Sequence, residues 1–232
     1  MAGSPADPDG IAGVLRACGV VGVLRAPTAD SAVQAALASV RGGLSAIELT
    51  FTTPGVTDAL RELRAALPAH VTLGAGTVMT GVQATSAITA GATFLISPHL
   101  GEDVLAVARE AGVPYLPGVL TPSEIVQAVR LGARTVKLFP AGTAGGPAYL
   151  RDLLGPLPDL QVMVTGGIPP REVGAYLAAG ALAAGLGSNL YPRAAMNGGD
   201  WEGVETATRT ALQEAGVALT GHRGVAATGA RA

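Results

Sequence analysis

The sequence has little of several things that whole classes of protein require. It contains a single cysteine, Cys18, which excludes an internal disulfide and favours a reducing compartment. Its formal net charge of −2 gives it no basic excess with which to bind the phosphate backbone of nucleic acids. The first residues show no basic segment followed by an apolar core, so we expect no secretory signal. We therefore expect a cytoplasmic protein whose partners are small molecules.

A long apolar run is also missing. Residues 71–98 carry no Asp, Glu, Lys or Arg, but glycine, threonine, serine and glutamine interrupt every apolar stretch of this segment. Such polar groups are costly in lipid, so we expect no transmembrane helix. With 49% hydrophobic and 14% charged residues, the chain has the composition of a folded globular protein rather than of a disordered one.

Lysine is nearly absent, because the chain has fourteen arginines and a single lysine, Lys137. This bias replaces lysine by arginine wherever a cation alone suffices. Arginine cannot supply a neutral amine, so the one lysine that remains indicates a site where such an amine is needed. Chance survival of a single lysine is the alternative.

What the sequence does contain is a regular alternation of short β-type runs and alanine-rich amphipathic stretches. Eight runs rich in Val, Ile, Leu and Thr begin about 23 residues apart, and each is followed by a segment of helical periodicity. This pattern predicts an α/β protein with the (β/α)8 TIM barrel fold, and an open doubly wound sheet is the alternative. The expected strands are 20–25, 45–51, 71–77, 93–97, 114–118, 134–139, 161–165 and 182–187. The expected helices are 30–41, 55–66, 81–90, 101–111, 122–131, 146–154, 169–179 and 202–214.

We expect one barrel domain over residues 8–217, with an extra N-terminal helix at about 8–18 that closes the bottom of the barrel. Residues 1–7 and 218–232 are rich in glycine and alanine without periodicity, and we expect them to be poorly ordered. Glycine follows several of the expected helices, where it can take the left-handed conformation that ends a helix. These glycines are Gly42, Gly91, Gly112, Gly132 and Gly180.

Alternation within two strands places two ionisable side chains inside the barrel. Side chains of a strand point to opposite faces in turn, and the apolar Val136 and Leu138 are expected to face the helices. Lys137 then points inward, and the same argument on the second strand points Glu48 inward. The second and sixth of eight strands lie opposite each other, so these two side chains can meet near the barrel axis.

This pair predicts a catalytic amine. An amine that is removed from water is more often neutral, and a neutral lysine can attack a ketone to form a Schiff base. Glu48 would then transfer protons through a water or a substrate hydroxyl. A structural ion pair between Lys137 and Glu48 is the alternative, because buried charges are usually paired.

Two glycine-rich turns follow the seventh and eighth expected strands. The first contains Thr165, Gly166 and Gly167, and the second contains Gly187 and Ser188. Turns at these two strand ends of a (β/α)8 barrel commonly expose backbone N–H groups that bind phosphate. Either turn alone indicates a tight turn, but two on adjacent strands predict a phosphate site. Their glycine spacing fits neither a dinucleotide fingerprint nor a Walker loop.

Other polar groups stand at the remaining strand ends. Thr77 follows the third strand with a hydroxyl suited to a carboxylate or carbonyl, and Pro98 follows the fourth. Arg25 ends the first strand, where it could bind an anion or form a salt bridge at the rim. No metal site is predicted, because the spacing of the three histidines matches no known ligand pattern. They are His70, His99 and His222.

Taken together, these motifs resemble the class I 2-keto-3-deoxy-6-phosphogluconate (KDPG) and 4-hydroxy-2-oxoglutarate (KHG) aldolase family. The matching stretches are VLRA, AIELTFTTP, LGAGTV, FLISPHL, YLPGVLTPSE, VKLFPA, VTGGI and GLGS, in family order over about residues 15–215. The resemblance implies a Schiff base on Lys137 and acid–base catalysis by Glu48, without a cofactor. It also implies a homotrimer that cleaves KDPG to pyruvate and D-glyceraldehyde 3-phosphate.

The resemblance also implies the binding roles of other residues. It places Thr77 near the carboxylate of pyruvate and Phe139 beside the lysine, with Pro98 as a further candidate at this end of the substrate. It places the phosphate among Thr165, Gly166, Gly167, Gly187 and Ser188. Many members have an arginine four residues after the glutamate, where this chain has Thr52. Carboxylate binding must then rely on Thr77, backbone groups or Arg25.

Two alternatives to KDPG cleavage remain open from the sequence. The AGLGSNLY segment is similar to the related 6-phosphogalactonate aldolases, so the substrate could be that epimer or a broader set of 4-hydroxy-2-oxo acids. The second alternative is a barrel that binds a phosphosugar without catalysis, in which Lys137 would only pair with an anion.

Overall fold

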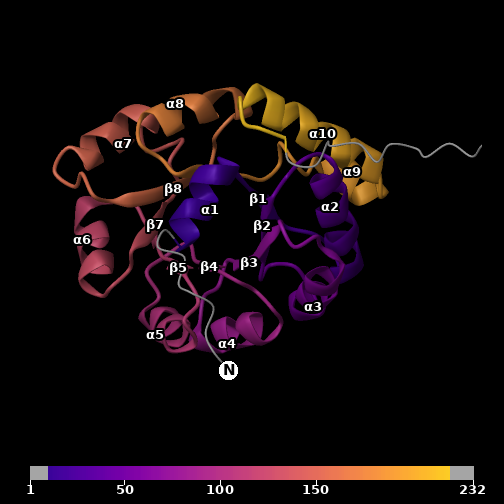
Figure 1. Cartoon of the computed structure of the whole chain (residues 1–232), viewed down its shortest axis with the longest axis horizontal. Helices are drawn as coiled ribbons and strands as arrows, with labels where there is room; N and C mark the ends of the chain where they lie inside the picture. Colours follow the sequence, from indigo (N-terminus) through magenta and orange to yellow (C-terminus); the bar gives the residue numbers. More distant parts are fainter. Residues whose placement is uncertain (1–9, 220–232) are drawn as a thin grey trace, which may run out of the picture.

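In the computed structural model, which describes residues 10–219, parallel strands form a ring that is surrounded by helices (Figure 1). The strand order in the single sheet is β5-β4-β3-β2-β1-β9-β8-β7-β6. The two ends of this order, β5 and β6, follow each other in the chain, so the sheet closes into a barrel. The strands are β1 Val20–Leu24, β2 Ala46–Thr50, β3 Thr72–Gly76, β4 Leu95–Ile96, β5 Tyr115–Leu116, β6 Gly118–Val119, β7 Thr135–Leu138, β8 Gln161–Thr165 and β9 Ala183–Leu186.

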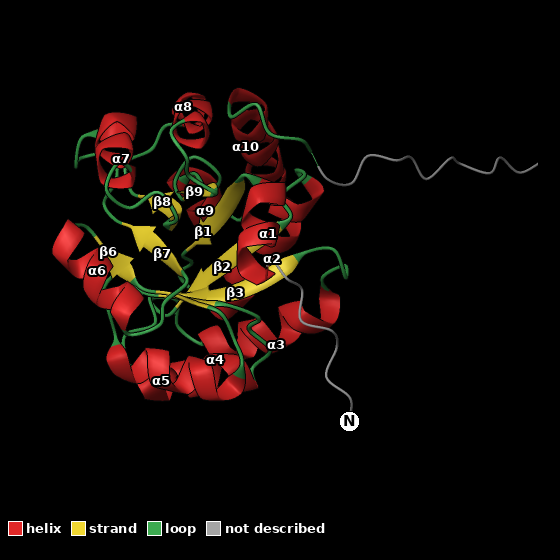
Figure 2. Ribbon diagram, turned by 60° about the vertical axis from the view of Figure 1, so that its left-hand side comes forward, coloured by secondary structure: helices red, strands yellow, loops and turns green. Residues whose placement is uncertain are grey.

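The helices are α1 Gly10–Cys18, α2 Ala29–Arg41, α3 Val56–Ala66, α4 Gly81–Thr89, α5 Glu102–Ala111, α6 Pro122–Arg130, α7 Gly146–Leu154, α8 Val173–Ala178, α9 Arg193–Gly198 and α10 Trp201–Glu214. Most of them connect successive strands and form the outer layer that Figure 2 shows in red around the yellow strands, whereas α1 precedes the first strand. Local sequence sets several starts: at α6, Thr121 and Glu124 form a reciprocal capping box, and Pro122 occupies the first turn. The TIM barrel prediction is confirmed.

Two predicted elements differ from the structure at prolines. The expected strand 114–118 is divided into β5 and β6 at Pro117, because proline has no N–H to donate to the strand ladder. The expected helix 169–179 instead begins with a 3-10 turn, Pro170–Glu172, and becomes α-helical at Val173. Pro170 keeps the residue before it extended, so a helix cannot include Pro169.

Other predictions were wrong in detail. Helix α9 was not expected, although Pro192 precedes it and Gly199 ends it in the left-handed conformation. Gly42 ends α2 with φ −70°, and the left-handed position belongs instead to Gly43, at φ 103°. Gly91, Gly112, Gly132 and Gly180 all have the expected positive φ. The predictions for residues 1–7 and 220–232, and for the first two residues of the N-terminal helix, lie outside the described residues.

The buried apolar side chains form two separate clusters. The larger cluster lies between the strands and the surrounding helices and includes Ile47, Leu49, Val136 and Leu138. The smaller one fills the lower barrel interior beneath α1, the helix that Figure 1 shows across the ring. Its members are Ala12, Leu15, Val21, Ala46, Phe94, Ile96, Leu116, Met163, Leu182 and Ala183. Helix α1 therefore closes one end of the barrel, as predicted.

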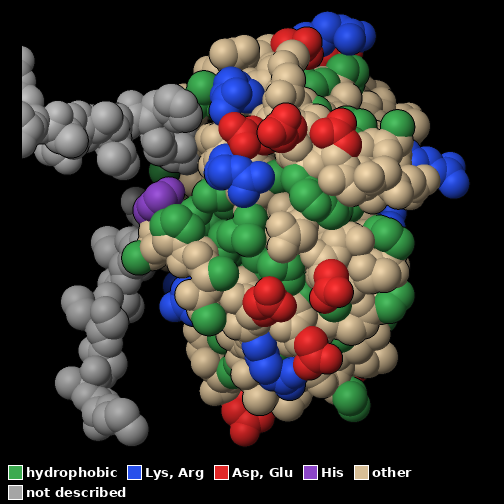
Figure 3. Space-filling model, turned by 90° about the vertical axis from the view of Figure 1, so that its right-hand side faces the viewer, with side chains coloured by type: hydrophobic (Ala, Val, Ile, Leu, Met, Phe, Trp, Pro, Cys, Tyr) green, Lys and Arg blue, Asp and Glu red, His purple; other side chains and the backbone are tan. Residues whose placement is uncertain are grey.

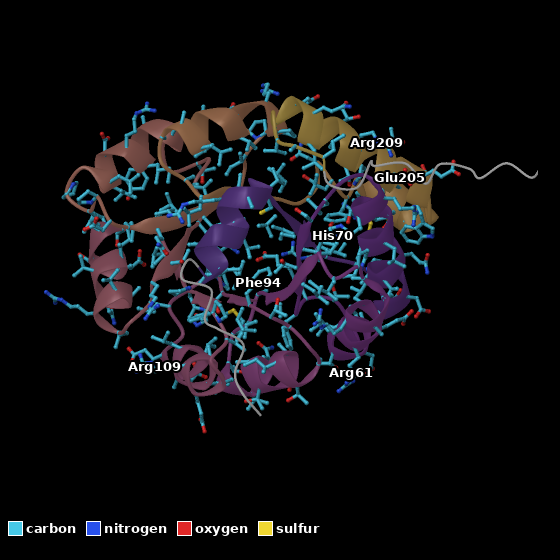
Figure 4. All side chains as sticks on the ribbon, viewed as in Figure 1. Arg61, His70, Phe94, Arg109, Glu205 and Arg209 are labelled. Carbon is cyan, nitrogen blue, oxygen red and sulfur yellow. The ribbon has the colours of Figure 1, made fainter. Side chains whose placement is uncertain are left out.

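Small residues in β3 make room for large interior side chains. A Cβ on Gly74 would lie 2.5 Å from ring atoms of Phe94, whose side chain Figure 4 shows within the ring. A Cβ on Gly76 would lie 2.9 Å from the carboxyl carbon of Glu48. Side chains from the barrel interior thus pack directly against β3 at two positions, the Phe94 ring against Gly74 and the Glu48 carboxyl group against Gly76.

The molecular surface carries charges of both signs. The face shown in Figure 3 has both acidic and basic side chains, and the basic ones do not merge into one broad surface. Some of these charges form ion pairs: the Glu205 carboxylate lies 3.0 Å from Arg41 Nε and 2.7 Å from Arg209 Nη2. Among the helices of residues 10–219, none is long and apolar enough to cross a membrane.

Candidate active site

Lys137 and Glu48 meet inside the barrel, as the alternation of side chains predicts. The Lys137 Nζ atom lies 3.9 Å from Glu48 Oε1, and the two residues are only 5% and 0% exposed. At 3.9 Å the two atoms attract each other without a direct hydrogen bond. Both carboxyl oxygens of Glu48 are buried and have no hydrogen-bond partner within the described part of the chain. A carboxyl group with only a structural role would normally accept hydrogen bonds through these oxygens. Their free acceptor positions therefore indicate a site that binds a small molecule.

The environment of Glu48 favours its protonated form. Burial raises the pKa of this carboxyl above its usual value of 4.5, and the charges of Lys137 and Arg25 oppose that rise. A raised pKa makes the Glu48 carboxylate a stronger base than a free glutamate, which suits an acid–base catalyst.

Phe139 follows the last residue of β7 and borders the lysine. The Lys137 Nζ atom lies 5.1 Å from the centre of the Phe139 ring. A Cβ on Gly166 would lie 3.0 Å from this ring, so the aromatic side chain also packs under the turn that follows β8. Phe139 therefore links the amine to the candidate phosphate turn.

At the rim above Glu48, Arg25 follows β1 directly and contacts a threonine in the turn after β2. Arg25 Nε donates a 2.7 Å hydrogen bond to Thr52 Oγ1, and the Thr52 and Thr50 hydroxyls are 2.8 Å apart. Thr50 lies two residues after Glu48 on β2 and was not among the predicted site residues. Only the structure reveals its link to Arg25, because that link depends on side-chain direction across two strands.

Thr77 has an unusual backbone conformation at the end of β3. Its φ is 54°, and among residues 10–219 it is the one non-glycine residue with a positive φ. A β-branched residue in this region costs free energy, and such strain is often found where a side chain or N–H group must be aimed at a ligand. The contact of Thr77 with the substrate stays a prediction, and its strained backbone is an observation in favour of that role.

The two glycine turns lie beside each other, because β8 and β9 pair with Thr165 opposite Gly185. Gly166 and Gly167 have φ values of 97° and 70°, which turn their backbone sharply at the strand end. Gly167 and Ser188 are exposed, while Gly166 and Gly187 are half-buried. The arrangement offers backbone N–H groups and one hydroxyl at a common mouth.

Thr165 is separated from these four residues. Its side chain is buried inside the barrel, where its Oγ1 would lie 2.5 Å from a Cβ on Gly185. Its hydroxyl has no hydrogen-bond partner among the described residues. The structure therefore places Thr165 below the glycine turns rather than within them, and its role in phosphate binding stays a prediction.

Pro98 lies at the same end of the barrel and is half-buried. A Cβ on Gly118 would lie 2.2 Å from the Pro98 carbonyl carbon, so glycine is required at that position for the two strand ends to approach. The neighbouring Ser97 is buried and donates its hydroxyl to the Val78 carbonyl oxygen. These contacts fix the mouth of the barrel between β3 and β6.

The opposite end of the barrel has a cavity of different character. It has a volume of about 1120 Å³ and is lined by Ile11, Arg109, Arg134, Leu157 and Gln161, among others. Neither Lys137 nor Glu48 contributes to it. For metals, no three His, Cys, Asp or Glu side chains gather into a possible binding site anywhere in residues 10–219. His222 lies outside that range.

Comparison with known proteins identifies the same family as the motifs. A family model described as KDPG and KHG aldolase matches residues 11–207. A 2-dehydro-3-deoxy-phosphogluconate aldolase of Pseudomonas aeruginosa is 40% identical over 172 residues, which are 74% of this chain and 78% of the relative. A KHG/KDPG aldolase of Escherichia coli K12 is 35% identical over 196 residues, covering 84% and 92% of the two chains.

A solved structure agrees with this result. The KDPG aldolase of Legionella pneumophila, with pyruvate captured as a covalent carbinolamine, matches with a TM-score of 0.79 at 30% identity. The match covers 86% of this chain and 97% of that chain. On the family match, the relatives and the fold, this chain belongs to the KDPG and KHG aldolase family.

Proposed function

We propose that this chain is a class I aldolase that reversibly cleaves KDPG to pyruvate and D-glyceraldehyde 3-phosphate. The observation that carries the proposal is the 3.9 Å approach of Lys137 Nζ to a buried Glu48 carboxyl that has no hydrogen-bond partner in residues 10–219. Family membership supports it, because the relatives named above are KDPG or KHG aldolases.

The first step is the addition of the neutral Lys137 amine to the C2 ketone. Nζ forms a bond to C2, the carbonyl oxygen takes up a proton, and loss of water from this carbinolamine leaves an iminium ion. The Legionella pneumophila relative was captured with pyruvate at the carbinolamine stage, which supports this step. A closed, apolar interior beneath the lysine helps, because it excludes water from the nitrogen.

The second step breaks the C3–C4 bond. The Glu48 carboxylate takes the proton of the C4 hydroxyl, the C3–C4 electron pair moves to the iminium, and D-glyceraldehyde 3-phosphate leaves. The enamine that remains is protonated at C3, and water then releases pyruvate and regenerates the amine. Glu48 lies close enough to Lys137 to reach groups two carbons away from the imine carbon.

The two ends of the substrate use opposite sides of the mouth. The turns with Gly166, Gly167, Gly187 and Ser188 bind the phosphate, and Thr165 lies beneath them. The keto-acid end lies toward Arg25, Thr52 and Thr77, with Phe139 and Pro98 beside it. No cofactor or metal takes part. We also propose that the enzyme is a cytoplasmic homotrimer, which light scattering on the purified protein would test.

The experiment compares kcat/KM for KDPG, for its phosphogalactonate epimer and for KHG, with pyruvate measured by lactate dehydrogenase. The proposal predicts cleavage, with the highest kcat/KM for KDPG. A higher value for the epimer would reassign the substrate within the family. Phosphosugar binding without release of pyruvate would contradict the proposal and favour a barrel that only binds.

A further inference from the structure

Three polar side chains form a continuous hydrogen-bonded chain at the C-terminal ends of β1 and β2. Arg25 Nε donates to Thr52 Oγ1 at 2.7 Å, and Thr52 Oγ1 is 2.8 Å from Thr50 Oγ1. Arg25 is exposed, Thr52 is also exposed, and Thr50 is fully buried at 0% exposure. The chain thus runs from the interior of the barrel out to its rim.

Burial fixes the direction of the hydrogen bond between the two threonines. A hydroxyl that is removed from water needs an acceptor for its proton, and leaving that proton unpaired is costly. Among the described residues, the one hydrogen bond of the Thr50 hydroxyl is the bond to Thr52. Thr50 therefore donates to Thr52. The Thr52 oxygen has two lone pairs, so it accepts from both Thr50 and Arg25.

This direction leaves the remaining donors unused. With both lone pairs of Thr52 occupied, its own proton must point to a third group. Arg25 donates to Thr52 through Nε, so the two terminal nitrogens of its guanidinium are available to bind a ligand. No carboxylate of residues 10–219 forms an ion pair with them. A guanidinium that is fixed at one nitrogen presents its other two in a plane suited to a carboxylate.

The rim position also faces the proposed reaction centre. Thr50 and Glu48 are two residues apart on β2 and so point to the same side of the sheet, into the barrel. The charge of Arg25 contributes to the environment of Glu48, where it opposes the rise of the pKa of that carboxyl. An anion held by Arg25 and Thr52 would therefore lie at the mouth above the Glu48–Lys137 pair.

We propose that Thr50 is a positioning residue for the keto-acid carboxylate: its buried hydroxyl donates to Thr52 and thereby directs the Thr52 proton and the Arg25 guanidinium at that carboxylate. Thr50 itself does not touch the substrate. The inference rests on the proposed function for the identity of the anion, and it explains how a threonine at position 52 can serve where many relatives of the family have an arginine.

The test measures adduct formation with two ketones that differ in charge. Enzyme is treated with borohydride and increasing pyruvate or pyruvamide, its neutral amide, and the reduced adduct is quantified by mass spectrometry. For Thr50→Val we expect the pyruvate concentration at half-maximal adduct to rise by about tenfold or more, as loss of oriented hydrogen bonds to a charged group predicts. The pyruvamide concentration at half-maximal adduct should change by less than about twofold, because an amide needs no charged partner.

Two further variants separate positioning from structure. Thr50→Ser retains the hydroxyl and should restore the preference for pyruvate. Thr53→Val is the matched control, because Thr53 is a buried threonine of the same segment whose Oγ1 accepts a 3.1 Å hydrogen bond from the Ala26 N–H. It should lower the thermal midpoint without changing the ratio of the pyruvate and pyruvamide values. Equal changes for both ketones in Thr50→Val, or no change for either, would overturn the proposal.

A second measurement keeps the inference independent of catalysis. Calorimetric binding of pyruvate is compared between Lys137→Met, which cannot form an imine, and the double variant Lys137→Met/Thr50→Val. Weaker binding by about tenfold in the double variant supports the role of Thr50, and equal binding contradicts it. A wild-type enzyme that forms no adduct would contradict the proposed function, and this calorimetric comparison would still decide the role of Thr50.

Discussion

The two halves of the barrel interior differ sharply in what they contain. The half beneath α1 is apolar, with Phe94, Ile96, Leu116 and Met163 packed against one another and closed from solvent by the helix. The half at the strand C-termini contains Glu48, Lys137, Thr50 and Thr165, and the hydroxyl or carboxyl oxygens of two of these have no hydrogen-bond partner within residues 10–219. One half stabilises the fold, and the other keeps buried oxygens of Glu48 and Thr165 free of hydrogen bonds within the described residues, where a substrate can use them.

The largest expected effect comes from removing the amine. Lys137→Met should abolish turnover, because methionine has a similar length but no nitrogen to form the imine. The variant should remain folded, since methionine keeps the apolar length of the buried side chain. Steady-state cleavage of KDPG and urea denaturation are the two measurements. Residual turnover close to wild type would place the reaction on another residue.

Glu48→Gln should slow cleavage by about 10²–10⁴-fold and leave adduct formation with pyruvate detectable. The pH dependence of stability provides a second reading. Because burial raises the pKa of Glu48 in the folded state, its contribution to stability is complete below the unfolded pKa and is lost as pH rises through the folded pKa. The thermal midpoint of Glu48→Gln should therefore rise relative to that of wild type as the pH increases above 4.5, the usual pKa of the carboxyl. A difference between the two midpoints that does not depend on pH would contradict a raised pKa of Glu48.

We expect that the apolar half of the barrel interior can be destabilised without loss of catalysis. Phe94→Ala should lower the free energy of unfolding by about 3–5 kcal/mol, since the ring is buried and would leave a cavity beneath Gly74. At a temperature where the variant is folded, kcat should change little. Denaturant unfolding and steady-state kinetics on the same preparation would check this. A loss of kcat comparable to that of Glu48→Gln would mean that the two halves are not independent.

The phosphate turns give the smallest predicted change. Gly167 and Gly166 have positive φ, so any side chain there strains the fold, whereas a Cβ on Gly187 would meet no atom closer than the Val23 carbonyl oxygen at 3.6 Å. Gly187→Ala should raise KM for KDPG relative to KHG, which has no phosphate, by about tenfold. The ratio of the two KM values is the readout, and equal losses on both substrates would argue against a phosphate at this turn.

Period-two alternation and βα repetition were enough to predict the barrel and the meeting of Glu48 with Lys137. Both follow from strand geometry that every β-strand shares. The division of β5 from β6 was also readable, because Pro117 stands within the run, yet the expected strand passed through it. Helix boundaries near Pro169 and Pro170 show the same oversight.

Features that depend on side chains meeting across strands could not be predicted. The bond from Arg25 to Thr52 requires the β1–β2 register, with Val23 opposite Glu48, and a particular side-chain direction. No sequence pattern predicts the positive φ of Thr77, because β-branched residues usually avoid that region. Thr165 is a different case, because the period-two alternation that points Lys137 inward also turns the Thr165 side chain into the barrel, and the prediction instead grouped it with Gly166 and Gly167.

The central claim is that Lys137 forms the Schiff base, and one measurement tests it most directly. The protein is incubated with pyruvate, reduced with borohydride, digested and sequenced by mass spectrometry. We expect the mass of reduced pyruvate on the peptide that contains Lys137, the one lysine of the chain. An unmodified Lys137 peptide from enzyme that remains active, or an adduct confined to another residue, would contradict the account.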